Sequence, residues 1–250
     1  GNLVISGAVG GSTDLSSYTV TTTGSASQTF SANVETTGNQ TYTAAGGIVT
    51  SGARTFDSSG GTVNFASALS GNNNVTVTGN ADIDGAITDI AVLSITGTAN
   101  IGADITSSDT QTYGDAVTLS ANVTLTTSSD VVTFDSTVNS DGSTRNLTIA
   151  TGGNSTEINF DGVVGGSAAV GAITITGALD LNAPIISATS LSVSGVSNLG
   201  ANVTTSGTQT YLAATTLSGG ARTLQGSTIQ TVAVSGAQNL TITGNLDLNG

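Results

Sequence analysis

The stretch VTVTGNADIDG, from Val75 to Gly85, decides the fold of this chain because it recurs along most of the sequence. Further copies read LSITGTANIGA (93–103), ITITGALDLNA (173–183), LSVSGVSNLGA (191–201) and LTITGNLDLNG (240–250), and a shortened copy, LVISG, begins at residue 3. Adjacent copies lie 18 residues apart twice, as between Gly79 and Gly97. Self-similarity at such a short period is typical of repeat architectures, in which each unit packs on its neighbours.

Within each copy, apolar residues alternate with Ser or Thr, which predicts a strand with one buried face. We expect the glycine that follows, such as Gly79, to take a positive φ at a bend. We expect the Asx residue three positions later, such as Asp82, to bond local backbone at a corner before an apolar residue re-enters the core. The residues expected to point inward are Val75, Val77, Leu93, Ile95, Ile173, Ile175, Leu191, Val193, Leu240 and Ile242.

A second marker is the tripeptide Gln-Thr-aromatic, which occurs at residues 28–30, 40–42, 111–113 and 209–211. The two markers occur together in one longer repeat, which reads LSITGTANIGADITSSDTQTY at 93–113 and LSVSGVSNLGANVTTSGTQTY at 191–211. Tyr42 and Tyr113 are 71 residues apart, whereas Tyr113 and Tyr211 are 98 apart. The longer unit contains an added segment, roughly 146–173, that we expect to form about one extra coil.

These observations predict an all-β chain, a parallel β-solenoid of short strands with about 18–27 residues per coil. Thr, Val, Ile and Gly dominate, and no stretch keeps a helical period. We expect residues 1–250 to form a single continuous array and to be a segment of a longer protein. Tandem β-sandwiches of 70–100 residues are the alternative architecture. The 18-residue spacing argues against them, because it is too short for a sandwich.

Composition narrows the possible functions. The chain has no Cys, His, Met, Trp or Lys, so the usual general base, metal ligand and thiolate nucleophile are missing. Its formal charge is −13, which repels nucleic acid and anionic membranes. The longest weakly polar run, residues 162–175, is shorter than a membrane-spanning helix. We therefore expect no nucleic-acid partner and no membrane span.

The stretch FDGVVGGSAAVGAITITGALDLNAPI (160–185), followed by GTQTYLAATTLSGGARTL (207–224), resembles the repeats of large bacterial exoproteins related to filamentous haemagglutinin. The resemblance covers nearly the whole chain. It implies a right-handed β-helical shaft, secretion by a two-partner or autotransporter route, and roles in adhesion, aggregation or biofilm. It also implies that the protein is secreted or lies on the bacterial cell surface. The ligand is not implied, because proteins with different targets share such shafts.

Candidate sites each have a structural interpretation beside a functional one. Asp82 with Asp84, and Asp180 with Asn182, place oxygens two residues apart and suggest Ca²⁺. The equivalent positions Asn100/Gly102 and Asn198/Gly200 do not keep a constant ligand set, which favours turns. The tyrosines could stack on sugars, but an aromatic residue at one repeat position more often forms a ladder. The aromatic positions concerned are Tyr42, Tyr113 and Tyr211.

Acidic residues could support glycoside hydrolysis, but Asp57, Asp130, Asp141 and Asp161 lie in turn contexts and no acidic cluster interrupts the repeat. The two glutamates are expected to be solvated strand residues, at positions 35 and 157. N-X-Ser/Thr sequons are frequent in a chain so rich in these residues and carry little weight. They occur at residues 39, 74, 122, 146, 154, 202 and 239.

We therefore expect no catalytic, cofactor-binding or metal-binding residues, no cofactor and no enzymatic activity. The leading hypothesis is an extracellular structural or adhesive shaft. The alternatives are a carbohydrate-binding β-helix module and a polysaccharide-degrading β-helix. The expected partners are further coils of the same chain or an identical subunit at the terminal coils, by self-association or end-to-end continuation, and also surface carbohydrate or neighbouring fibres. NLVISG (2–7) and NLTITG (239–244) share one phase, which suggests that the chain opens and closes at the same point of the coil.

Overall fold

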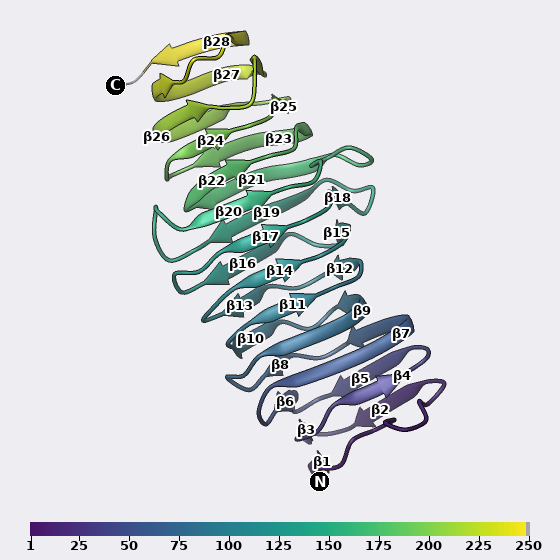
Figure 1. Ribbon diagram of the computed structural model, residues 1–250. Coiled ribbons are helices and arrows are strands. Elements are labelled where there is room, and N and C mark those ends of the chain that lie inside the picture. Colours follow the sequence, from purple (N-terminus) through teal and green to yellow (C-terminus); the bar gives the residue numbers. More distant parts are fainter. Residues whose placement is uncertain (249–250) are drawn as a thin grey trace.

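The computed structural model describes residues 1–248, which form one elongated β-solenoid (Figure 1). The chain winds through about 12 turns of ~20 residues, and the two termini lie at opposite ends of the stack. Every strand pairs in parallel with strands of the neighbouring coils, and the described residues contain no helix. The prediction of an all-β parallel solenoid is confirmed, with a coil length within the predicted range for most coils.

Each coil passes through three strand positions, and strands at one position pair from coil to coil to give three faces. Face 1 contains β1 (Leu3–Ile5), β3 (Gln28–Phe30), β6 (Ile48–Thr50), β8 (Leu69–Ser70), β10 (Ile87–Ile90), β13 (Ile105–Ser107), β16 (Val123–Thr127), β19 (Arg145–Ala150) and β21 (Val170–Thr176). Face 2 contains β4 (Val34–Thr36), β11 (Leu93–Ile95), β14 (Gln111–Tyr113), β17 (Val132–Phe134), β20 (Glu157–Phe160), β22 (Ala178–Leu181) and β24 (Ser197–Leu199).

Face 3 contains β2 (Tyr18–Thr22), β5 (Gln40–Ala44), β12 (Ala99–Ile101), β15 (Val117–Leu119), β18 (Val138–Ser140) and β25 (Val203–Thr205). The longer strands continue around corners and belong to more than one face. They are β7 (Arg54–Phe65), β9 (Val75–Ile83), β23 (Ile185–Val193), β26 (Gln209–Leu217), β27 (Arg222–Ser235) and β28 (Leu240–Leu248).

The core is a set of inward columns in which each coil adds one residue directly above the last. On face 2, one such column is continuous through ten strands, and all its members are buried. It contains Val34, Phe56, Val77, Ile95, Tyr113, Phe134, Phe160, Leu181, Leu199 and Leu217. Eight of the ten residues predicted to point inward are buried. Leu240 and Ile242 are half-buried because they belong to the last coil.

A six-residue unit underlies the 18-residue period. In the regular part, successive strands begin the same unit at Ile87, Leu93, Ala99 and Ile105, and Ile105 pairs with Ile87 one coil below. Three strand-plus-corner units therefore make one coil. Longer coils carry loops at their corners: Leu147 pairs with Ile173, 26 residues on, so the added segment does form about one coil.

The three faces accept the same sequence unit. LSITG begins at Leu93 on face 2, but the matching LSVSG begins at Leu191 on face 1, where Leu191 pairs with Ile173. The predicted common phase of the two ends is wrong for the same reason. Leu3 lies on face 1, whereas Ile242 pairs with Leu224 on face 3. Sequence matching finds equivalent units but does not say which face each unit occupies.

Two local predictions need correction. Gly79 has φ +105°, as predicted, but Gly97 does not lie in the left-handed region. A Cβ on Gly97 would stand 2.5 Å from the carbonyl carbon of Gly79, so close stacking of corners requires the glycine there. The side chains of Asp82, Asn100, Asp180 and Asn198 bond side chains of neighbouring coils and not local backbone at corners. Asp82 lies within β9 with its side chain outward, and its partners are side chains on neighbouring coils.

Replacing Ile95 with Asp tests the core. Ile95 is 1% exposed, and truncation of such a residue to Ala costs ~2–5 kcal/mol. We expect Ile95→Asp to cost at least as much, because it also buries a carboxylate without a partner. The adjacent outward variant Ser94→Asp is the control and should change the melting temperature little. Equal melting temperatures for both variants would contradict the core assignment.

Candidate functional site

The Gln-Thr-Tyr marker is a buried hydrogen-bonding unit and not a ligand site. Gln111 Nε2 donates to Ser107 Oγ at 3.1 Å and to the Thr126 carbonyl of the next coil at 2.9 Å. Tyr113 Oη donates to Gln111 Oε1 at 3.0 Å, and neither side chain is exposed. One glutamine thus joins the preceding strand, the next coil and the tyrosine on its own strand. Burial raises the pKa of Tyr113 well above its ordinary value, which keeps this phenol a donor.

The same unit recurs on each face. On face 3, Gln40 bonds Thr36 Oγ1 and the Asp57 carbonyl and accepts from Tyr42 at 2.7 Å. On face 1, Gln209 bonds Thr205 Oγ1 and the Gln225 carbonyl and accepts from Tyr211 at 3.1 Å. The tripeptide is apparent in the sequence, but the Thr or Ser four residues before the glutamine, which completes the unit, was not predicted.

The first copy lacks two parts of this unit, since the residue four before Gln28 is Gly24, which has no hydroxyl. Gln28 is followed by Phe30, which has no hydroxyl, and Gln28 Oε1 is buried without a hydrogen-bond partner. Gln28 Nε2 still donates to the Val20 and Thr43 carbonyls at 3.1 and 2.8 Å. Phe30 itself is fully buried against Tyr42 and Phe56. The first copy therefore shows the glutamine without its tyrosine hydroxyl and without the hydroxyl four residues earlier.

We predict that Tyr113→Phe lowers the free energy of unfolding by ~1–3 kcal/mol, since it leaves Gln111 Oε1 buried and unpaired. Gln111→Leu combined with Tyr113→Phe removes both partners and should cost less than the sum of the two single changes. Denaturant unfolding of the four proteins gives the coupling energy. Additive costs would show that the tyrosine hydroxyl does not serve the glutamine.

The aromatic residues form ladders, as predicted. Tyr113, Phe134 and Phe160 stack on successive coils, with centroids 5.1 and 5.0 Å apart and interplanar angles of 11° and 4°. Tyr42 stacks on Phe65 in the same way. The chain has nine aromatic residues; Tyr18 is half-buried and the other eight are buried. Among the described residues, Tyr18 is thus the only aromatic residue with a partly exposed ring.

The proposed calcium residues belong to outward ladders of Asp and Asn. On face 3, Asp82 Oδ2 accepts from Asn64 and Asp82 Oδ1 accepts from Asn100, each at 2.7 Å. Asn64 also donates to Asp84 at 3.0 Å. Both oxygens of Asp82 therefore already have amide partners, one on the coil below and one on the coil above.

Face 2 repeats the arrangement. Asp180 Oδ1 accepts from Asn198 at 2.8 Å, and Asn182 donates to Asp161 at 2.7 Å. Among residues 1–248, no three Asp, Glu, His or Cys side chains come together as a group that could hold a metal ion. The arrangement serves to bridge coils.

A shallow groove of about 290 Å³ follows the face 3 ladder. Its lining comes from β9, β12 and β15, from the corner before β12 and from one residue of β7. It is lined by Thr62, Asn80, Ala81, Asp82, Thr98, Ala99, Asn100 and Thr118. Hydroxyl and amide groups of this kind can hydrogen-bond a polyol, but Asn80 Oδ1 is already used by Thr98 at 2.9 Å.

We predict that chelation leaves the stability unchanged. If Asp82 and Asp180 are satisfied by asparagines, excess EDTA should not move the melting temperature, since no bound ion stabilises the folded state. Differential scanning calorimetry compares the melting temperature in EDTA with the melting temperature in ~5 mM Ca²⁺. A large fall on chelation, restored by Ca²⁺, would favour the calcium interpretation.

The acidic residues considered for catalysis do not gather at one place. Asp57 lies on β7 beside Glu35 of β4, an outward pair that the sequence analysis treated separately. Asp130 lies in the turn between β16 and β17, and Asp161 follows β20. Glu157 is exposed, as predicted, whereas Glu35 is half-buried. The spacing of 22 residues between Glu35 and Asp57, about one coil, is the sequence signal that could have paired them.

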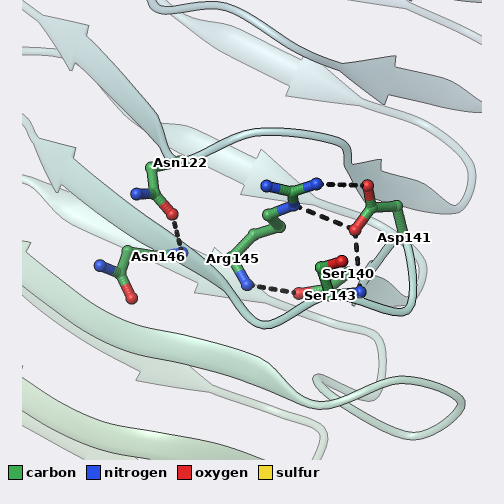
Figure 2. Close-up of polar contacts among 6 residues, drawn as sticks. All are labelled: Asn122, Ser140, Asp141, Ser143, Arg145 and Asn146. Carbon is green, nitrogen blue, oxygen red and sulfur yellow. Dashed lines mark hydrogen bonds and ion pairs between the residues drawn. The ribbon is translucent and has the colours of Figure 1, made fainter.

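Asp141 has a specific structural partner, shown in Figure 2. Arg145 donates from Nε and Nη2 to the two carboxylate oxygens at 3.0 and 2.8 Å, and Ser143 N–H donates to Oδ1 at 3.0 Å. The bonds from Arg145, followed by that from Ser143, lower the pKa of Asp141 to about 2. Arg145 N–H also bonds Ser140 Oγ at 3.2 Å. These contacts close the turn between β18 and β19.

The other two arginines clamp turns. Arg54 Nε donates to the Phe30 carbonyl of the coil below at 3.1 Å, while its Nη atoms bond the Ala53 and Ser51 carbonyls. Arg222 repeats this geometry with the Leu199 carbonyl at 3.1 Å. The similar stretches SGARTF (51–56) and GGARTL (219–224) therefore form one kind of turn, which is used on two faces. All three arginines are engaged in structural contacts.

Asparagines link the coils in a way that the sequence analysis missed. Asn122 Oδ1 accepts from Asn146 N–H at 2.9 Å, as Figure 2 shows, and Asn146 Oδ1 accepts from Ala172 N–H on the following coil at 2.9 Å. Asn39 and Asn202 act in the same way. Asn154 Oδ1 accepts from Ser194 Oγ at 3.0 Å, so five of the seven sequon asparagines have a structural use for the amide oxygen. The spacing of 24 residues between Asn122 and Asn146, about one coil, is the signal in the sequence for this pair.

Comparison with known proteins found no matching family model, no matching curated protein and no matching solved structure. Within residues 1–248, no helix has the length and apolarity needed to cross a bilayer.

Proposed function

We propose that this chain is part of an extracellular shaft or fibre of a bacterial surface protein and serves attachment, aggregation or biofilm scaffolding. The family resemblance to exoproteins related to filamentous haemagglutinin supports this proposal, and so does the solenoid fold. The proposal includes export to the cell surface and the absence of enzymatic activity. Its main support is the uninterrupted stack of coils.

The outward surface continues with the same regularity as the core. One outward row on face 2 carries Ser, Thr, Asn or Asp at ten successive coils. Its members are Thr55, Thr76, Ser94, Thr112, Thr133, Asn159, Asp180, Asn198, Thr216 and Ser235. Such a row keeps a long rod hydrated without many charged side chains. The coils rise by the strand spacing of ~4.8 Å, so the stack is about 60 Å long.

The negative net charge argues against binding to nucleic acids. The chain has sixteen acidic residues and only three basic ones, and these three arginines are hydrogen-bonded within turns. The field around the rod is therefore negative and repels other polyanions at low ionic strength. It also keeps neighbouring rods apart unless salt screens the repulsion.

The experiment compares intact producer cells that carry the unaltered gene, Ile95→Asp or Ser94→Asp. Antibodies against the chain should label intact cells, and external protease should remove the label. Ile95→Asp should reduce attachment or aggregation because it disrupts the coils, whereas Ser94→Asp should leave both unchanged. A label found inside the cell, or attachment that is equal in all three strains, would contradict the proposal.

The groove on face 3 favours one other function, a carbohydrate-binding module. Calorimetric titration with a panel of soluble oligosaccharides distinguishes it from a shaft. Binding by the unaltered chain that is lost in Asn100→Ala with Thr118→Ala would favour the binding module. Release of new reducing ends from any polysaccharide would favour a degrading enzyme instead.

A further inference from the structure

The sequon asparagines share one place in the repeat unit. In six of the seven sequons the asparagine stands directly before an inward residue and the threonine directly after it, as with Asn122, Val123 and Thr124. Alternate residues of a strand point to the same face, so the asparagine and the threonine share the outer surface. The seventh, Asn154, lies in the turn between β19 and β20, and all seven asparagines are exposed. The number of sequons carries little weight, but the fold places every one of them on the surface.

The amide nitrogen of these asparagines is free. Among residues 1–248, no sequon Nδ2 atom has a hydrogen-bond partner, and neither has the hydroxyl of the threonine two residues later. Asparagines outside the sequons differ, because five of them use Nδ2 to donate to a neighbouring coil. These five are Asn64, Asn73, Asn100, Asn182 and Asn198. The nitrogen that is free in the sequons is therefore the atom that bridges coils elsewhere.

The amide oxygen of most sequon asparagines is anchored. Asn122 Oδ1 accepts from the Asn146 N–H at 2.9 Å, as Figure 2 shows. Asn39, Asn146, Asn154 and Asn202 also use Oδ1 as an acceptor, at 2.9–3.0 Å. Oxygen and nitrogen are bonded to the same planar carbon, so an anchored oxygen holds the nitrogen at a fixed place on the surface.

We propose that the sequon asparagines are N-glycosylated, so that the shaft carries sugars at repeated positions of its outer surface. A transferase of the producing cell takes the sugar from a glycosyl diphosphate. Nδ2 forms a bond to the anomeric carbon, the bond from that carbon to the diphosphate oxygen breaks, and the diphosphate leaves with the electron pair. One N–H proton passes to a base of the transferase. The inference rests on the proposed function, since it places the sugars on a shaft outside the cell.

The structure tolerates this modification because the sugar replaces one amide hydrogen and leaves the carbonyl oxygen unchanged. The bond from Asn122 Oδ1 to the next coil therefore persists after glycosylation. A sugar on Asn100 or Asn198 would instead compete with the donor that each of them gives to an aspartate one coil below. Only 8% of the residues are charged, and sugars add a bulky, solubilising surface without further charge.

The test uses the chain as its producing cells make it, together with two threonine variants. Thr124→Val removes the sequon of Asn122 but leaves the bond from Asn122 to Asn146 in place. Thr118→Val is the matched control, because Thr118 is an outward threonine of β15 that belongs to no sequon. Peptide mass spectrometry with electron-transfer fragmentation locates each sugar. The antibody label of intact cells is recorded for the same cultures.

We expect sugar at the sequon asparagines and none at asparagines outside sequons, such as Asn198. Thr124→Val should lose the sugar at Asn122 alone, with little change in melting temperature, and Thr118→Val should keep every sugar. The proposal is overturned if all seven sequon peptides have the mass of the unmodified chain, or if Asn122 keeps its sugar in Thr124→Val. A sugar-free chain at the cell surface overturns this inference alone, whereas a glycosylated chain found only inside the cell contradicts the proposed export alone.

Discussion

The parallel pairing of each coil with the next is the interaction on which the rest of the structure depends. It fixes the vertical spacing, and it places every inward residue directly above its equivalent one coil below. Short strands of three residues, such as β11 and β12, are too short to be stable alone. They are stable because the coils on both sides supply hydrogen-bond partners for their backbone and packing partners for their core side chains.

The polar groups in the core follow the same rule. Glutamines at positions 40, 111 and 209 are fully buried, yet each donates to the next coil and accepts from a tyrosine. A buried polar side chain is tolerated when its partners are complete, and Gln28 shows the incomplete case. Outside the core, asparagines and the two turn-clamping arginines connect coils through backbone groups. Contacts between successive coils thus stabilise both the core and the surface of the molecule.

Much of this architecture could be predicted from the sequence. The alternation around Val75 and Ile95 identified the buried face, and the extra segment after Asn146 was recognised as a coil. The six-residue unit was missed because its polar members, such as Gln111 and Ser107, hide the apolar period. The face occupied by each repeat was also missed, since three equivalent faces accept one unit. Pairs such as Glu35 and Asp57 depend on coil lengths, which vary with loops that sequence alone does not measure.

The central claim is that residues at one strand position form a single straight row along the rod. Because the chain has no cysteine, spin labels can be attached to introduced cysteines on the outward row of face 2. Double electron–electron resonance measures the distance from a label at Thr76→Cys to a second label on the same row. The second label is placed three coils away at Thr133→Cys, six coils away at Asn198→Cys or seven coils away at Thr216→Cys. The distances should rise linearly, from about 14 Å to about 29 Å and about 34 Å, by one strand spacing per coil. Distances that do not increase with the number of coils, as in a string of separate sandwich domains, would contradict the account.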